Sequence, residues 1–535
     1  MVLSRLLETK YNSITGAAII IGAASLVSRI IGLVRDRLFA HYFGAGDIMD
    51  AYYAAFRIPD FVYNIVVVGA LSAGFIPVFM ELLVKDKEEA RRVTNSVITI
   101  LAFTLTIVCL ILYIFTPQLV TKLTPGFLGS KYELTLTFTR IMLLSPVLLG
   151  ISGVISGVLQ SYKAFLVYSL TPIMYNIGII VGVTVFVPLF GLNGLAYGVI
   201  LGALMHLCIQ IPALIHYGFN FRPLLLWKHP SVRKIGWLLI PRTLGMATQQ
   251  INKVAITIIG SLLVSGSLTI FNLADNLQSV PSGIVGISFG MAIFPVLAEL
   301  AAQNKKQEFV DRISSTTRQI LFLILPLTIL FIILRAQIVR VTLGTGKFDW
   351  DATVLTFQTL AFFSISLFAQ SLIPMLARAF YALQDTWTPF IIGMCSTLVN
   401  VLAALYFAKS FGVIGLACAY SASMIIQTAL LWIFLRHKTH GLNEKSIVIS
   451  IIKMSVAVLG MGFVIQLLKK PMSLVVDMEK FWGILTQGLV CGTVGLITYL
   501  VLCRLLKLEE VFSFQQSLKR KWLKFRGTEI EPVDQ

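Results

Sequence analysis

Ser28-Arg29-Ile30-Ile31-Gly32-Leu33-Val34-Arg35-Asp36-Arg37 places three arginines and one carboxylate inside the first long apolar segment of the chain. A charge in the hydrocarbon region of a membrane is costly, so such a residue usually faces a polar cavity or a partner. The alternative is that Arg35-Asp36-Arg37 lies at a helix end and extends its side chains to the interface. Arg29 fits this alternative less well, because apolar residues flank it on both sides. Arg35 and Asp36 point in adjacent directions on a helix, so they need not pair with each other.

The composition identifies the class of protein. Of the 535 residues, 57% are hydrophobic and 13% are charged, whereas a soluble domain carries about 25% charged residues. Apolar segments of about 20 residues recur along almost the whole chain, and each can cross a hydrocarbon core of about 30 Å. The sequence predicts an all-α polytopic membrane protein with about 14 transmembrane helices. The predicted spans are 14–43, 47–84, 93–116, 134–160, 165–188, 193–217, 232–263, 267–300, 314–335, 353–383, 388–408, 413–435, 447–468 and 481–503.

The formal net charge of +18 is spread unevenly over the loops. Basic residues cluster in alternate loops, whereas the opposite loops are short and nearly neutral, with Arg335, Arg340 and Lys347 as exceptions. By the positive-inside rule this pattern predicts two cytoplasmic termini, and it argues against a nucleic-acid partner. Residues 511–535 are predicted to form a basic cytoplasmic tail, which either rests on anionic lipid or is solvated.

The chain contains a weak internal repeat. Three short sequences return in the same order, shifted by 218 to 224 residues: Phe75-Ile76-Pro77-Val78 as Ile293-Phe294-Pro295-Val296, Gln160 and Asn176 as Gln384 and Asn400, and Phe190-Gly191 as Phe411-Gly412. Six helices per repeat is an even number, so the two copies share one orientation, as in transporters whose halves rock around a central cavity. The predicted domains are a six-helix lobe at 1–220, a second at 221–440, and two additional helices at 441–510.

Several motifs occur in order over nearly the whole chain: Ser28-Arg29-x-x-Gly32-x-x-Arg35-Asp36, Phe43-Gly44-Ala45-Gly46, Asp50-Ala51-Tyr52, Phe56-Arg57-Ile58-Pro59, Pro281-Ser282-Gly283-x-x-Gly286 and Tyr381-Ala382-Leu383-x-Asp385-Thr386-x-Thr388-Pro389. Together they resemble the signature of the MurJ/MviN family, part of the multidrug/oligosaccharidyl-lipid/polysaccharide exporter superfamily. The resemblance implies two six-helix lobes and two extra C-terminal helices in the bacterial inner membrane. It also implies a flippase that moves lipid II, the undecaprenyl-pyrophosphate-linked peptidoglycan precursor, to the outer leaflet.

The resemblance further implies that Arg29, Arg35 and Asp36 line a central cavity. Arginine suits a pyrophosphate diester because its planar fork binds phosphate oxygens bidentately and stays charged. We expect Asp36 and Asp50 each to neutralise a nearby arginine between transport events, since unpaired cations inside a membrane are costly. The predicted substrate-binding residues are Arg29, Arg35, Asp36, Asp50, Arg57 and Asn276.

The chain departs from the family pattern at positions where family members often carry charges; it has Tyr63, Asn64, Val68 and Asn276 there. The alternative is therefore a flippase for another polyprenyl-pyrophosphate-linked oligosaccharide, of the O-antigen or exopolysaccharide type. A multidrug exporter is less favoured, because it requires acidic cavity residues and the candidates in the first lobe are mainly basic.

Few residues are suited to chemical catalysis. The cysteines form no CxxC pair and the histidines no metal-binding spacing, so no metal site is predicted. The sequence has no DDxxD motif and no P-loop, which argues against an enzyme and against ATP as the energy source. We expect a monomer without a cofactor, driven by an ion gradient or the membrane potential. Asp275 and Asn400 are the candidate ion-coupling residues.

Overall fold

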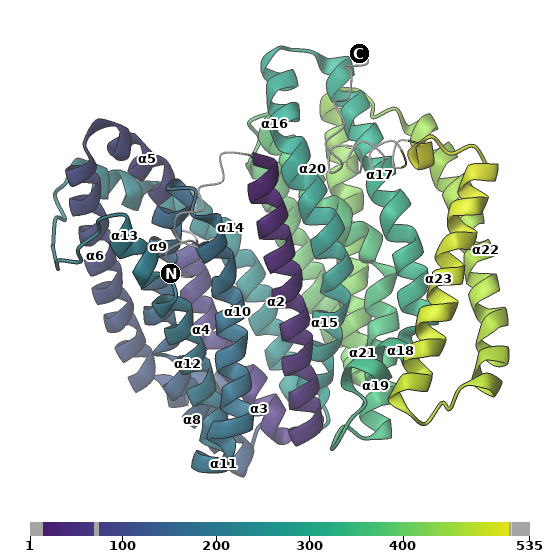
Figure 1. The fold of residues 1–535 in the computed structure, drawn as a ribbon, viewed down its shortest axis with the longest axis horizontal. Helices are drawn as coiled ribbons and strands as arrows, with labels where there is room; N and C mark the ends of the chain where they lie inside the picture. The colour runs from purple at the N-terminus through teal and green to yellow at the C-terminus, as the bar shows by residue number, and fades with distance from the viewer. Residues whose placement is uncertain (1–13, 69–73, 513–514, 516–535) are drawn as a thin grey trace. The chain divides into compact units, whose positions relative to one another are not determined.

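The computed structural model describes residues 14–68, 74–512 and 515, with the backbone alone described at 14–20, 68 and 239–246. Every regular element in this part of the chain is a helix, as Figure 1 shows. The predicted all-α class is therefore confirmed. The predicted tail at 511–535 lies outside the described residues, apart from 511, 512 and 515.

The described chain forms two compact units. Unit 1 extends to Asn272 and includes Thr342–Ala352 and Ala404–Leu416, whereas unit 2 contains Leu273–Val341, Thr353–Ala403 and the chain from Ala417 onward. The lobe boundaries expected at residues 220 and 440 stay predictions.

Unit 1 is built on α2, whose apolar run lacks proline and ends where Gly44 takes a left-handed backbone conformation, with φ of 66°. Helix α2 packs on α10, and α10 packs on α12 through glycines: a Cβ added to Gly178 would collide with Gly202 Cα. Small residues let membrane helices approach this closely. The elements are α2 (Ile14–Phe43), α3 (Asp47–Ala55), α4 (Arg57–Val62), the π-helix η1 (Tyr63–Val68), α5 (Ile76–Lys85), α6 (Lys87–Ile114), α7 (Thr116–Leu123), α8 (Gly129–Met142), α9 (Ser145–Ser161), α10 (Phe165–Val181), the π-helix η3 (Gly182–Phe186), α11 (Val187–Phe190), the 3-10 helix η4 (Gly191–Asn193), α12 (Gly194–Cys208), α13 (Ile211–His216) and α14 (Pro230–Ser261).

Unit 2 has one large apolar core, in which α17 and α23 both pack with α22. Helices α22 and α23 lie side by side in Figure 1. The buried Tyr499 donates a hydrogen bond of 2.9 Å to the carbonyl oxygen of Phe322 and so joins α23 to α17. The elements are α15 (Ser267–Ser282, which begins in unit 1), the π-helix η5 (Gly283–Ile287), α16 (Ser288–Ala302), α17 (Lys306–Ile333), α18 (Arg335–Leu343), α19 (Trp350–Ile365), α20 (Leu367–Ala382), α21 (Trp387–Thr439), α22 (Glu444–Val475) and α23 (Phe481–Leu505).

The membrane-spanning character of the chain is confirmed by the length and apolarity of its helices. Among the described residues, eight helices can cross a membrane, or nine if the bent pair α19 and α20 forms one span. Helix α21 has 53 residues and is interrupted at Gly412, where φ is 57°. The expected total of fourteen spans stays a prediction.

The internal repeat is visible in the backbone. The π-helices η1 and η5 begin at Tyr63 and Gly283, 220 residues apart. Positive φ angles recur 221 residues apart, at Gly191 and Gly412 and at Lys163 and Gln384. These backbone features follow the offset of the sequence repeat, so the two halves share local backbone structure at these positions.

Candidate functional site

An ion pair inside α2 is the first part of the candidate site. The Nε and Nη2 atoms of Arg35 both donate to Asp36 Oδ1, at 3.0 and 2.7 Å. The expectation that these adjacent residues need not pair is thus superseded, because the long arginine side chain turns back to its neighbour's carboxylate. Asp36 is 3% exposed, so the carboxylate is shielded from solvent, whereas the Arg35 side chain is 21% exposed. A buried carboxylate of this kind holds the guanidinium in one orientation.

Asn176 on α10 completes this cluster. Arg35 Nη1 donates to Asn176 Oδ1 at 3.0 Å, and Asn176 Nδ2 donates to the carbonyl oxygen of Pro172 at 3.0 Å. The second hydrogen bond fixes the amide so that its oxygen faces the arginine. Three N–H groups of Arg35 have partners among the described residues, and the other two remain for a ligand.

Arg57 forms a second cluster, at the start of α4. Its Nε donates to Thr257 Oγ1 at 2.9 Å, and its Nη2 donates to Asn272 Oδ1 at 2.6 Å. Asn272 is itself oriented, since its Nδ2 donates to the carbonyl oxygen of Leu268 at 2.6 Å. Arg57 is half-buried, and neutral groups on α14 and α15 orient its guanidinium.

Asp50 is almost completely buried, with 2% exposure, and it binds the first turn of α15. Its Oδ1 accepts hydrogen bonds from the amide and the hydroxyl of Thr269, at 2.8 and 2.7 Å. Its Oδ2 accepts from the amide of Gly266 and from Lys131 Nζ, both at 2.8 Å. The expected arginine partner of Asp50 is therefore wrong: a lysine neutralises it, and the amides at the helix start stabilise its charge.

Comparison with known protein families identifies the family of the chain that carries these clusters. A family model described as "Lipid II flippase MurJ" matches residues 39–485. The chain belongs to the MurJ family. The matched range contains Asp50, Arg57 and the second half of the repeat, whereas the Arg35–Asp36 pair lies just before it.

Individual relatives agree with the family match. The chain is 27% identical to a lipid II flippase MurJ of Burkholderia cenocepacia, over 79% of this chain and 84% of that protein. It is 31% identical to a probable lipid II flippase MurJ of Vibrio cholerae, over 78% of this chain and 82% of that protein.

Solved structures share the fold. A lipid II flippase MurJ in an inward closed conformation matches with a TM-score of 0.75 and 25% identity, over 91% of this chain and 98% of that one. An inward-facing multidrug resistance transporter of the MATE family matches with a TM-score of 0.67 over 80% of this chain and 99% of that one. Since its identity is only 15%, it supports the fold alone.

The remaining predicted site residues of this MurJ-family chain occupy different environments. Arg29 is half-buried on α2 and has no hydrogen-bond or ion-pair partner among the described residues. Asp275 accepts a hydrogen bond of 2.8 Å from Gln278 Nε2 on the same helix, beside the half-buried Asn276. Asn400 is 1% exposed on α21.

Sequence reasoning missed four residues that hold the predicted ones: Lys131, Asn176, Thr257 and Thr269. Of these four, only Asn176 is marked by the sequence, as the repeat partner of Asn400, and that pattern assigns it no contact with Arg35. A signal for Lys131 was present, because it is a basic residue in a weakly charged segment between apolar runs. The threonines gave no signal, since transmembrane helices commonly contain them.

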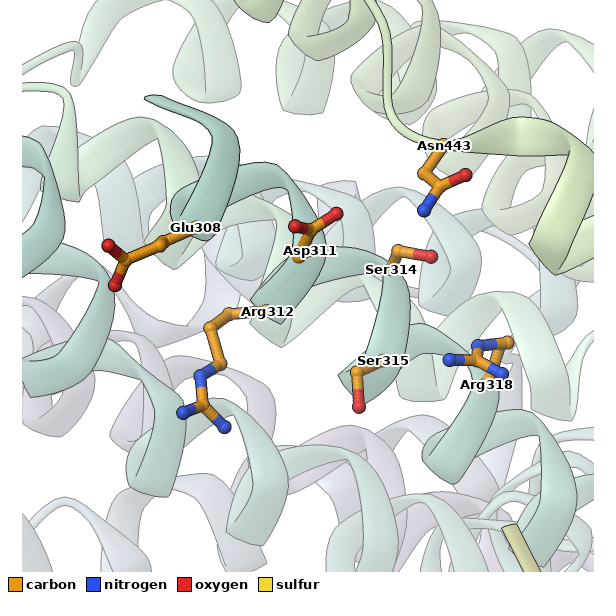
Figure 2. A pocket seen from close by; sticks show the side chains of 7 residues that line it. All are labelled: Glu308, Asp311, Arg312, Ser314, Ser315, Arg318 and Asn443. Atoms are coloured by element: carbon orange, nitrogen blue, oxygen red, sulfur yellow. The ribbon is translucent and has the colours of Figure 1, made fainter. Parts of the chain in front are cut away.

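A cavity of about 460 Å³ opens at the start of α17, away from these clusters in the sequence. Figure 2 shows that its lining comes from α17, with Asn443 entering from the segment before α22. Arg318 lines it but is paired with Glu509 and Glu510 at 2.9 and 3.0 Å. The charge of Arg318 is therefore balanced by carboxylates of the same chain. In the described part of the chain, no group of three metal-binding side chains occurs.

Proposed function

We propose that this chain flips lipid II, the undecaprenyl-pyrophosphate-linked peptidoglycan precursor, from the cytoplasmic to the outer leaflet of the bacterial inner membrane. Membership of the MurJ family supports the substrate, since its relatives carry that name. The observation that carries the proposal is the Arg35 guanidinium, held inside an apolar helix by Asp36 and Asn176 with N–H groups left to bind. The chain transports and performs no covalent chemistry.

The arginines bind the pyrophosphate in this proposal. Arg29, Arg35 and Arg57 supply positive charge, and Arg35 offers its two remaining N–H groups to phosphate oxygens as a fork. Asp36 remains beside Arg35 throughout, and its negative charge offsets part of the attraction between Arg35 and a phosphate. This weakens the bound state and favours release on the other side of the membrane.

Polar groups on α15 act with the arginines. Asn276 contacts the sugar or peptide part of the substrate, where an amide can donate and accept. Asp50 acts through the position of α15, because its described hydrogen bonds all go to Lys131 and the helix start. Asp275 and Asn400 couple transport to an ion gradient or to the membrane potential, without a cofactor.

Fourteen membrane spans are compatible with the lengths of the helices described above. Helix α21, with 53 residues, is more than twice as long as a hydrocarbon core requires, and Gly412 divides it into two spans. Lobes at 1–220 and 221–440, with two helices at 441–510, then rock as a monomer around the substrate, and both termini are cytoplasmic.

The test is rescue of a bacterium in which the host lipid II flippase is depleted. Expression of this chain restores growth and rod shape, and Arg35→Ala abolishes rescue at equal membrane abundance. Arg92→Ala is the matched control, because Arg92 is an exposed arginine at the start of α6. Rescue of an O-antigen or exopolysaccharide flippase mutant, combined with failure in the lipid II strain, would contradict the proposal.

A further inference from the structure

A second cavity, of about 570 Å³, lies within unit 2 at the C-terminal end of α22. It is lined by side chains of α18, α22 and α23, among them Gln337, Lys469, Lys470 and Gln487. The positive-inside topology proposed above places this end of α22 at the outer surface of the membrane. The cavity belongs to neither arginine cluster and has no part in the proposed binding of lipid II.

A chain of amides fixes the polar wall of this cavity. Gln487 Nε2 donates to the carbonyl oxygen of Lys469 at 2.8 Å, and Gln337 Nε2 donates to Gln487 Oε1 at 2.7 Å. Both orientations are set by that carbonyl, which can only accept. Gln337 Oε1 is left buried with no donor among the described residues, and Gln337 is 7% exposed. A buried acceptor of this kind calls for a donor from a bound molecule.

The charge at the cavity is positive. Lys469 Nζ donates to the carbonyl oxygen of Ile333 at 3.3 Å, and Lys470 is exposed with no partner for its ammonium among the described residues. None of the described lining residues is acidic. The carboxylate of Asp477, on the following loop, is already paired with Lys480 Nζ at 3.1 Å. The cavity therefore attracts a phosphate and repels an ammonium group.

Apolar side chains lie next to the lysines. Phe463 and Leu467 line the cavity from α22 and are 66% and 57% exposed. Exposed apolar residues on a membrane helix contact acyl chains, whereas lysines near a helix end reach the headgroup region. One site thus offers both surfaces that a phospholipid requires.

We propose that this cavity binds the headgroup of an anionic phospholipid with a free hydroxyl, a phosphatidylglycerol, in the outer leaflet. The phosphodiester pairs with Lys469 and Lys470, a headgroup hydroxyl donates to Gln337 Oε1, and an acyl chain packs on Phe463 and Leu467. A phosphatidylethanolamine binds less well, because its ammonium group lies against the two lysines.

The purified full-length chain, stripped of lipid in detergent, tests the charge requirement by native mass spectrometry. Phosphatidylglycerol and phosphatidylethanolamine with the same acyl chains are titrated, and the first binds at least about tenfold more tightly. Lys469→Gln with Lys470→Gln lowers phosphatidylglycerol affinity about tenfold or more. The matched control is Lys122→Gln with Lys409→Gln, at two exposed residues outside the cavity. This control binds phosphatidylglycerol as tightly as the unmodified chain does.

Phosphatidylmethanol tests the hydroxyl, because it has the same phosphodiester charge without a headgroup hydroxyl. The unmodified chain prefers phosphatidylglycerol over phosphatidylmethanol, and Gln337→Leu removes this preference while phosphatidylmethanol affinity is kept. Circular dichroism checks folding, and Lys470→Gln alone, at an exposed position, serves if a buried variant misfolds.

Three results would overturn the proposal. The first is that the Lys469→Gln, Lys470→Gln double variant and the Lys470→Gln single variant both bind phosphatidylglycerol as tightly as the unmodified chain. The second is displacement of phosphatidylglycerol by an equal concentration of sn-glycerol 1-phosphate, which would identify a site for free phosphates. The third is preferential displacement by inorganic pyrophosphate, which would assign the cavity to the transported substrate. None of these readouts depends on flipping, so failure here leaves the proposed function intact.

Discussion

Lys131 Nζ lies 2.8 Å from Asp50 Oδ2 and joins the start of α8 to a carboxylate that also binds the first turn of α15. The same ammonium lies 2.7 Å from Asp47 Oδ1. Lys131 is 12% exposed at its side chain, so its attraction to the two carboxylates is only partly screened by water. The position of α15 within unit 1 therefore depends on a charge contributed by α8.

Asp50→Asn is expected to lower the free energy of unfolding by about 3 kcal/mol, because Lys131 loses its buried anionic partner. Lys131→Met is expected to cost less, since three neutral donors still stabilise Asp50. The double variant should recover part of the loss. Thermal unfolding in detergent measures all three, and strictly additive losses would show that the two residues are not coupled.

Arg35→Lys should impair transport severely although the charge is kept. A lysine ammonium cannot bind Asp36 and Asn176 at once and still present two parallel N–H groups to phosphate. The measurement is rescue of flippase-depleted cells at matched protein level, with Arg92→Lys as the exposed control. Full activity of Arg35→Lys would reduce this residue to a general positive charge, and full activity of Arg35→Ala would remove it from the mechanism.

Alanine at Arg57 should abolish flipping, whereas alanine at the exposed Lys253 should be milder. Thr257 contacts both residues: Arg57 donates to Thr257 Oγ1, and that hydroxyl donates to the backbone carbonyl oxygen of Lys253. Thr257→Val should therefore have an intermediate effect through the orientation of Arg57. Equal damage from Lys253→Ala, at equal abundance, would contradict a pyrophosphate site based on the N-terminal arginines.

Asp385, in the loop between α20 and α21, stabilises the first turn of α21. Burial disfavours its charge, but hydrogen bonds from Lys438 Nζ at 2.6 Å and from the amide and hydroxyl of Thr388 outweigh this and lower its pKa to about 2. Because the folded pKa lies below the unfolded value of about 4, the carboxylate stabilises the fold above pH 4, and this stabilisation disappears as the pH falls through 2.

Asp385→Asn should accordingly lower stability by about 1 kcal/mol at neutral pH, through loss of the ion pair and a weaker helix start. The difference from the unmodified chain should narrow as the pH falls from about 4 to about 2. Thermal unfolding across this range measures it, with Asp351→Asn as the exposed control. A difference that is constant with pH would exclude the charge as its origin.

The sequence predicted the apolar helices well because length and hydropathy determine them. The expected span 14–43 coincides with α2, and the expected span 481–503 differs from α23 by two residues. The expected span 47–84 was less accurate, since its chain is divided into α3, α4, η1 and α5. Hydropathy does not report such breaks, which depend on local backbone hydrogen bonding.

The site was less predictable because its geometry depends on residues distant in the sequence. Arg35, Asp36 and Arg57 stood out as charges in apolar surroundings, and the structure gives each a polar contact. Their partners Asn176 and Thr257 are 141 and 200 residues away from Arg35 and Arg57. No periodicity of one helix contains that information, so the hydrogen-bond partners required the fold.

The π-helix η5 changes which face of its helix the following side chains occupy. A π turn accommodates one residue more than an α turn, so side chains after it are rotated by about 100° relative to a continuous α-helix. A helical wheel drawn through Gly283–Ile287 thus assigns the residues of α16 to the wrong face. Deleting one residue within Gly283–Ile287 would restore the α register and leave the side chains of α16 facing the neighbours that they have now.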